Sequence, residues 1–135
     1  MSTETPAFEM TIEVILLPVS DLERAKDFYA NKLGFHLDYD SEFNDMRFIQ
    51  LTPRGSGCSI VMGTGIKGLS EMTPGSIKGT HLVVKNIGQV REAFIKNGVD
   101  VSDIEDMGGG VKYAYFSDPD GNFWALQELG SRATA

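Results

Sequence analysis

Apolar and polar residues alternate along this chain with two patterns, one typical of strands and one typical of helices. The two patterns occur in the same order twice. In the first half, a β-rich apolar run at residues 13–19 precedes residues 20–34, whose apolar side chains recur at helical spacing. Three shorter β-like runs follow, separated by polar or glycine-containing breaks, at residues 35–40, 46–52 and 58–63. This order predicts one βαβββ unit.

The predicted first helix has recognisable ends. Ser20 and Glu23 have the spacing of a capping box, in which each side chain bonds a free backbone N–H, and Asp21 is the alternative cap residue. Gly34 can adopt the left-handed conformation that ends a helix. The helix is therefore expected between these residues.

The second half repeats the unit. A strand is predicted at residues 80–84 and a helix at 86–98, with three further strands at residues 99–104, 111–116 and 122–128. Asn86 and Gln89 form the expected cap pair of this helix, and Gly98 its stop. The offset between matching elements stays at about 65 residues, which indicates an internal duplication.

The predicted fold class is α+β, with two tandem βαβββ units that form a curved eight-stranded mixed sheet around a cavity. We expect a single domain over residues 10–130, with units at about 12–63 and 78–129 and a linker at 64–77. The polar stretches 1–9 and 130–135 are expected to be tails. A concave junction between two units is a usual place for a small ligand.

Charge and composition exclude several classes of partner. The net charge of −7 and the pI near 4.7 argue against nucleic acid and anionic membrane surfaces, which need clustered Lys and Arg. No run approaches the roughly 18 apolar residues of a membrane span. A single cysteine, Cys58, and the lack of an apolar signal stretch indicate a protein of the reducing cytoplasm.

Two motifs carry a family resemblance, VSDLERAKDFYANKLGF near the start and FSDPDGNFWALQE near the end. Together they resemble the vicinal oxygen chelate superfamily, which holds glyoxalase I, extradiol dioxygenases, fosfomycin-modifying enzymes and bleomycin-binding resistance proteins. The resemblance covers roughly Ile12 to Leu129. It implies the paired βαβββ fold and often a homodimer, and it does not fix the reaction.

Enzymes of this superfamily typically hold one divalent metal with four side chains from the first and last strands of each unit. The corresponding positions in this chain are Val14, Ser59, Gly79 and Ala125. Two apolar residues, a glycine and a hydroxyl cannot hold such an ion, so no metal cofactor is expected at these positions. A divalent metal held by other groups stays open.

Strand alternation selects the candidate site residues. His81 and Gln127 lie two residues beyond Gly79 and Ala125, so both should face the cavity. His81 could act as a base or orient a ligand, or it could be a structural histidine, and Gln127 is expected to bond either the ligand or His81. Further predicted ligand-binding residues are Gln50, Tyr113, Tyr115 and Phe123, with core packing as the alternative for the aromatic side chains.

Two functions fit these residues. The preferred one is a glyoxalase/bleomycin-resistance-type protein without the family metal ligands, which binds a small organic molecule such as a drug or metabolite. The alternative is a lyase, isomerase or dioxygenase of the same superfamily that uses His81 or a relocated divalent metal. Binding is preferred because a single histidine rarely supplies a reaction by itself.

Overall fold

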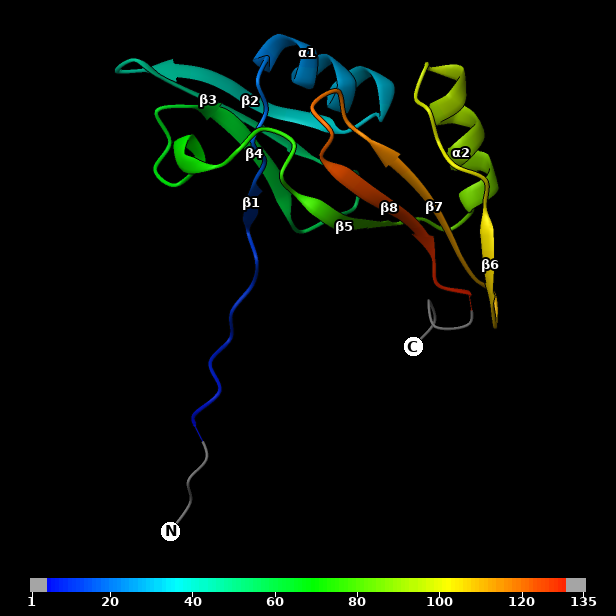
Figure 1. Cartoon of the computed structure of the whole chain (residues 1–135). Coiled ribbons are helices and arrows are strands. Elements are labelled where there is room, and N and C mark those ends of the chain that lie inside the picture. Colours follow the sequence, from blue (N-terminus) through cyan, green and yellow to red (C-terminus); the bar gives the residue numbers. More distant parts are fainter. Residues whose placement is uncertain (1–4, 131–135) are drawn as a thin grey trace.

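Two four-stranded sheets carry the strands of this protein (Figure 1). The computed structural model describes residues 5–130. The first unit consists of β1 Val14–Leu16, α1 Leu22–Asp27, a π-helical turn Phe28–Lys32, β2 His36–Phe43, β3 Met46–Thr52 and β4 Ser59–Thr64. The second unit consists of β5 Lys78–Val83, α2 Ile87–Lys96, β6 Glu105–Gly108, β7 Val111–Ser117 and β8 Phe123–Glu128. Between the units lies one turn of 3₁₀ helix, Leu69–Glu71.

The sheet topology is the same in both units. The strand orders are β1-β4-β3-β2 and β5-β8-β7-β6, and only the β1–β4 and β5–β8 pairs are parallel. The α+β class with tandem βαβββ units is thereby confirmed. The eight strands form two separate hydrogen-bonded sheets, so the expected curved sheet is interrupted between β1 and β5.

Both helices begin where the sequence provides a cap. Asp21 accepts a hydrogen bond from the Arg24 N–H at 3.1 Å, so the alternative cap is correct and the Ser20 box is not formed. In α2, Asn86 accepts from the Gln89 N–H at 3.1 Å, as predicted. Gly34 and Gly98 follow the helices with φ of 82° and 89°, the left-handed conformation that glycine favours.

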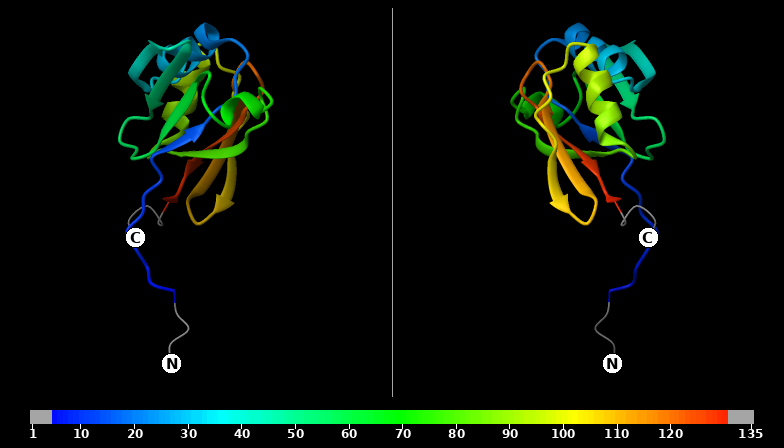
Figure 2. Two further views of the ribbon diagram at one scale, coloured as in Figure 1. Left: turned by 90° about the vertical axis from the view of Figure 1, so that its left-hand side faces the viewer. Right: turned by 90° about the vertical axis from the view of Figure 1, so that its right-hand side faces the viewer.

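One apolar core lies between the helices and the two sheets. The helices lie on the same side of the molecule (Figure 2), and each sheet turns one face toward them. The buried side chains come from both units, which is why neither unit would be stable alone. The largest of them are Leu17, Tyr29, Ile49, Leu51, Met62, Ile87, Trp124 and Leu126.

A buried hydrogen-bond network, which we call the inter-unit lock, joins the first unit to the turn before β8. Tyr29 donates to Asp118 Oδ2 at 2.7 Å and accepts from Trp124 Nε1 at 3.0 Å. Asn122 Nδ2 donates to the Pro18 carbonyl at 2.9 Å and to Asp118 Oδ2 at 2.8 Å. The D-P-D-G-N motif is therefore the structural link between the repeats.

One predicted strand is misplaced. Residues 99–104 were expected to be extended in the sheet, but β6 begins only at Glu105. Ser102 explains the shift, because its backbone N–H donates to the Tyr115 carbonyl and its hydroxyl accepts from the Tyr115 N–H at 2.8 Å. A side chain thus takes the place of a strand carbonyl, while Val99 and Val101 enter the core. Regular hydrogen-bond pairing of β6 with β7 begins at Glu105.

Two further expectations concern the ends of the chain and a membrane-spanning helix. Residues 1–4 and 131–135, parts of the expected tails, lie outside the described residues. Within residues 5–130, no helix has the length and apolar character needed to cross a membrane.

Candidate functional site

The face of the second sheet that points away from the core carries a row of aromatic side chains. Alternation sends Leu82, Trp124 and Leu126 into the core. It sends Tyr113, Tyr115, Phe123, His81 and Gln127 to the opposite face, where they lie on three adjacent strands. The sequence prediction for four of these residues rested on this alternation, Phe123 was predicted as an aromatic residue of the last strand, and the structure brings all five together.

The rings of Tyr113, Tyr115 and Phe123 form a stacked row, called here the aromatic ladder. The Tyr113 and Tyr115 rings are 6.1 Å apart with 12° between their planes, and the Tyr115 and Phe123 rings are 5.5 Å apart with 15°. Offset stacking at these distances is favourable and holds the rings in one orientation. The ladder therefore presents a preorganised aromatic surface.

His81 closes one end of the ladder. Its ring meets Tyr113 edge to face, with centroids 5.7 Å apart and planes at 90°. His81 Nδ1 lies 2.6 Å from the Gly79 carbonyl, and a carbonyl can only accept, so Nδ1 carries the proton. In the neutral imidazole, Nε2 is then left as an acceptor for a ligand.

The backbone around Gly79 explains the position of His81. A bulge between Lys78 and Thr80 shifts the register, and Gly79 adopts φ 93°. As a result His81, not Gly79, lies directly opposite Ala125. The His81 side chain thus lies beside Ala125, at the position where the sequence analysis expected Gly79.

Polar groups define the chemistry of the ladder. Gln127 Nε2 donates to the Tyr113 hydroxyl at 2.7 Å, a partner that the sequence did not predict. Burial raises the pKa of Tyr115, and the nearby Glu105 charge raises it further. These effects, together with a hydrogen bond to Glu105, keep this phenol neutral.

Gln50 belongs to a different group, the polar cluster of the first sheet. Its Nε2 donates to Asp38 Oδ2 at 3.1 Å and to Ser59 Oγ at 3.4 Å, and Thr52 lies 2.5 Å from Ser59. Thr52 also donates to Asp38, which lowers the pKa of this carboxyl, with a further contribution from His36. The structure therefore separates Gln50 from the other predicted ligand-binding residues.

Asp38 and Thr52 were not predicted as members of a site. Thr52 shares the strand phase of Gln50, so alternation could have found it. Asp38 lies at a bulge between Leu37 and Tyr39, and its carboxylate is on the same face as His36, with which it forms a contact of 2.8 Å.

Cavities lie at both ends of the aromatic ladder. One of about 230 Å³ sits between the two sheets and is lined by His81 together with Ile12, Ile15, Ser59 and Trp124 among others. The other, of about 360 Å³, is lined by Tyr115 and Phe123 with Asp100 and Ser102. The ladder thus connects a mainly apolar hollow with a more polar one.

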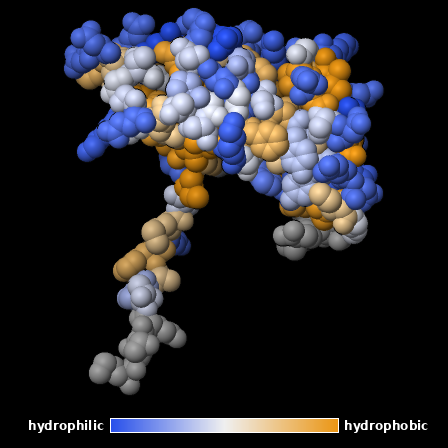
Figure 3. Space-filling model, viewed as in Figure 1, coloured by the Kyte–Doolittle hydropathy of each residue, from blue (hydrophilic) through white to orange (hydrophobic). Residues whose placement is uncertain are grey.

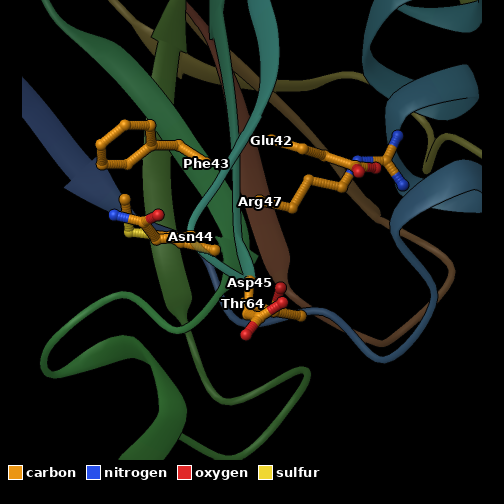
Figure 4. A pocket seen from close by; sticks show the side chains of 7 residues that line it. Glu42, Phe43, Asn44, Asp45, Arg47 and Thr64 are labelled. Carbon is orange, nitrogen blue, oxygen red and sulfur yellow. The ribbon is translucent and has the colours of Figure 1, made fainter.

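A third hollow, of about 390 Å³, lies at the β2–β3 hairpin and takes no part in this arrangement. It is lined by residues 42–47 and Thr64. Arg47 points toward α1, where it pairs with Glu23, whereas Phe43 and Asn44 point the other way (Figure 4). Its lining side chains do not converge on one point, so we do not assign it a ligand.

The residues at the superfamily's metal positions do not fit a metal ion. Val14 and Ser59 are direct neighbours across β1 and β4, and Ala125 lies between His81 and Tyr115. With His81 in the place expected for Gly79, these positions offer one imidazole nitrogen and one hydroxyl oxygen, which are too few ligands for a divalent cation. In residues 5–130, no three His, Cys, Asp or Glu side chains are grouped so as to hold one.

Comparison with known proteins identifies relatives of this architecture. The family model described as Glyoxalase/Bleomycin resistance protein/Dioxygenase superfamily matches residues 11–126. No curated protein sequence matches the chain.

Solved structures agree with this match. TnmS3, an antibiotic binding protein from Streptomyces sp. CB03234, is 30% identical with a TM-score of 0.80, over 91% of this chain and 98% of that one. A glyoxalase/bleomycin resistance protein from the same strain is 33% identical with a TM-score of 0.74, over 86% and 98%. A superfamily member from Sphaerobacter thermophilus DSM 20745 is 31% identical with a TM-score of 0.76, over 89% and 98%.

Proposed function

Since the chain belongs to the glyoxalase/bleomycin resistance protein/dioxygenase superfamily, we propose that it binds a small aromatic molecule, a drug or metabolite, against the aromatic ladder. The observation that carries the proposal is the near-parallel stacking of Tyr113, Tyr115 and Phe123 on a face that the core does not use. Aromatic walls with a few placed polar groups suit flat ligands.

The polar groups around the ladder would set the orientation of the ligand. His81 Nε2 offers an acceptor at one end, and the neutral Tyr115 hydroxyl beside Glu105 offers a second polar contact. Gln127 holds the Tyr113 ring by its hydroxyl, which limits the loss of side-chain entropy on binding. A similar structure, TnmS3, is an antibiotic binding protein, which supports a ligand of this class.

Binding can be tested with two probes, 8-anilinonaphthalene-1-sulfonate and bleomycin, by fluorescence and calorimetry. We expect Tyr115→Leu to weaken binding about tenfold, the value of one lost aromatic contact. Tyr39→Leu is the matched control, because Tyr39 is also an exposed aromatic residue but lies on the first sheet. Equal affinity of the wild type and Tyr115→Leu, or weaker binding only by Tyr39→Leu, would refute the ladder as the site.

The second candidate function is catalysis with His81 as base. It is favoured by one observation, the free Nε2 beside a cavity. A lyase, isomerase or dioxygenase would also need a partner for the developing charge, and Gln127 is already bonded to Tyr113. His81→Ala should abolish turnover if this function is correct, and it should weaken probe binding only about threefold to thirtyfold if His81 orients a ligand.

Metal analysis separates the two functions further. We propose that the protein binds its ligand without a metal, because the superfamily positions, with His81 in the place expected for Gly79, offer only one imidazole and one hydroxyl. Elemental analysis after soaking in Zn, Ni, Mn and Fe(II) should find less than stoichiometric metal. A full equivalent of metal that survives desalting would reverse the order of the two functions.

We also propose a homodimer that works in the reducing cytoplasm. The open faces of both sheets carry apolar residues that a monomer leaves in water, among them Tyr39 and Val83. One cysteine, Cys58, gives no internal disulfide, as in most cytoplasmic proteins.

A further inference from the structure

A hollow of about 220 Å³, called here the helix-side hollow, lies between the two units on the core side of the sheets. It is bounded by the loop between the π-helical turn and β2, by the β3–β4 turn, by β5 and by α2. On the face seen in Figure 3, hydrophobic side chains reach the surface over α2, the helix that forms one wall. The aromatic ladder lies on the opposite face of the second sheet, so the two places are separate.

The walls of the helix-side hollow are an open part of the apolar core. Phe94 and Leu126 belong to the buried core, whereas Leu33, Leu82, Val84 and Val90 pack against it and are only partly buried. These four side chains keep some apolar surface in contact with water. An apolar molecule that fills the hollow would remove this surface from water and extend the core.

Arg54 is the only charged side chain among the described residues that line the helix-side hollow. Arg24, Arg47 and Arg91 each pair with a carboxylate. In the same part of the chain, residues 5–130, no ion pair includes Arg54. Acidic residues are in excess in this chain of net charge −7, yet this arginine borders an apolar hollow without one. Its guanidinium therefore favours a ligand that brings its own carboxylate.

The backbone of β5 supplies a second donor to the hollow. Within its sheet β5 pairs only with β8, and Val84 N–H donates to the Gln127 carbonyl at 2.8 Å. Successive residues of a parallel strand direct their N–H groups to opposite sides, so Val83 N–H points to the edge of β5 that has no strand partner. Val83 lines the hollow and is 56% exposed. An anion in the hollow would thus have a side-chain donor and a backbone donor.

We infer that the helix-side hollow binds a small apolar molecule that carries one carboxylate. Its apolar body lies against Leu82, Val90 and Phe94, and its carboxylate faces Arg54. The volume is below the roughly 300–1,000 Å³ of pockets for drug-sized ligands, so a medium-chain or arylalkyl acid fits better than a large antibiotic. Because both units line the hollow, the bound acid stabilises the folded state. The inference is independent of the function proposed for the aromatic ladder.

The test is calorimetric titration of the full chain with three probes of similar shape and different charge. Octanoate should bind at one saturable site with a Kd below about 1 mM. Uncharged 1-octanol should bind about three- to tenfold more weakly, and octylammonium more weakly still, because Arg54 repels it. Lack of saturable octanoate binding, or equal affinity for the three probes, overturns the inference.

Two charge variants then test Arg54. Arg54→Met should weaken octanoate binding about three- to tenfold and leave 1-octanol binding unchanged. Lys67→Met is the matched control, because it removes one positive charge at an exposed residue outside the hollow, and it should change octanoate affinity less than about twofold. Equal effects of the two variants overturn the role of Arg54. Bleomycin affinity should be the same in Arg54→Met and the wild type, and a joint loss of both ligands overturns the separation of the hollow from the ladder.

Nuclear magnetic resonance and a filling variant locate the bound acid. Octanoate should shift the amide signals of Val83 and Val90, and Val90→Trp, which places a large ring in the hollow, should weaken octanoate binding at least about tenfold. If Val90→Trp does not fold, the amide shifts and Arg54→Met still decide. Shifts confined to Tyr113, Tyr115 and Phe123 overturn the inference. So does an octanoate affinity that falls as the protein concentration rises, because a second copy of the chain then covers the hollow.

Discussion

The hydroxyl of Tyr29 lies 2.7 Å from Asp118 Oδ2, and this contact joins the π-helical turn after α1 to the turn before β8. Burial raises the pKa of Tyr29, and the Asp118 charge raises it further, so the phenol stays protonated and donates. The hydroxyl oxygen of Tyr29 also accepts a hydrogen bond from Trp124 Nε1. One hydroxyl thus satisfies two buried groups of the other unit.

Removal of this hydroxyl should destabilise the protein. Tyr29→Phe leaves Asp118 without one donor and the Trp124 N–H without an acceptor, which should lower the free energy of unfolding by about 1–3 kcal/mol. Denaturant unfolding at pH 7 measures the change. Tyr39→Phe is the control, because Tyr39 is 52% exposed and should lose less than about 0.5 kcal/mol. Equal losses in the two variants would contradict a special role of the lock.

Asn122→Asp should make the stability depend on pH. Asn122 Nδ2 lies 2.8 Å from Asp118 Oδ2, so the variant places two buried carboxyl groups side by side and loses both donors. The unfolding free energy at pH 7 should fall by about 3 kcal/mol or more. Because like charges raise the pKa of one carboxyl, the folded variant binds more protons than the unfolded chain, and stability should recover between pH 7 and 5.

The control for this pair lies on the surface. Asn31 Nδ2 donates to Asp27 Oδ1 at 2.7 Å, which is the same geometry at an exposed site. Asn31→Asp should cost less than about 0.5 kcal/mol, because water screens the two charges. A similar cost and pH dependence in both variants would mean that burial is not the cause.

A second pH effect comes from Asp40. Hydrogen bonds from Arg47, and next from Lys26, hold the pKa of Asp40 well below its usual range. The folded-state pKa is depressed, so this stabilisation is present above the unfolded pKa of about 3.9 and is lost as the pH falls toward the folded value. Asp40→Asn should be less stable than the wild type by about 1–2 kcal/mol at pH 7. The difference should shrink below about pH 4, and a difference that stays constant to pH 2 would disprove the linkage.

Two glycines with the same backbone conformation should respond differently to substitution. Gly75 and Gly55 have φ of 81° and 85°, which any other residue adopts at a cost. A Cβ on Gly75 would lie 2.0 Å from the Asp120 carbonyl oxygen, whereas a Cβ on Gly55 would meet nothing within 4 Å. Gly55→Ala should cost about 1 kcal/mol from backbone strain alone. Gly75→Ala should cost at least about 3 kcal/mol because the backbone must move, as thermal unfolding can show.

Much of the fold was predictable because local signals agreed with the tertiary structure. The order of elements, the Asn86 cap and the stops at Gly34 and Gly98 all follow from patterns within a few residues. The misplaced strand at residues 99–104 depends on Ser102, whose hydroxyl binds a residue 13 positions away. Alternation alone cannot reveal such a contact.

The candidate site was predictable to the extent that strand phase held. His81, Tyr113, Tyr115 and Gln127 fall on one face because β5, β7 and β8 are regular beyond the Gly79 bulge. Asp38 was not predicted, because its role depends on contacts with Thr52 and Gln50 of the neighbouring strand, and Gln50 itself lies on the other sheet from the aromatic ladder.

The position of the inter-unit lock has a mechanical consequence. Pro18 follows the first strand and Asn122 precedes the last, so their hydrogen bond connects the beginning and the end of the folded chain. A pulling force applied to one end of the chain is therefore transmitted to both units before either unit can unfold by itself. The two repeats are therefore expected to unfold together, so the chain should unfold under force in a single event.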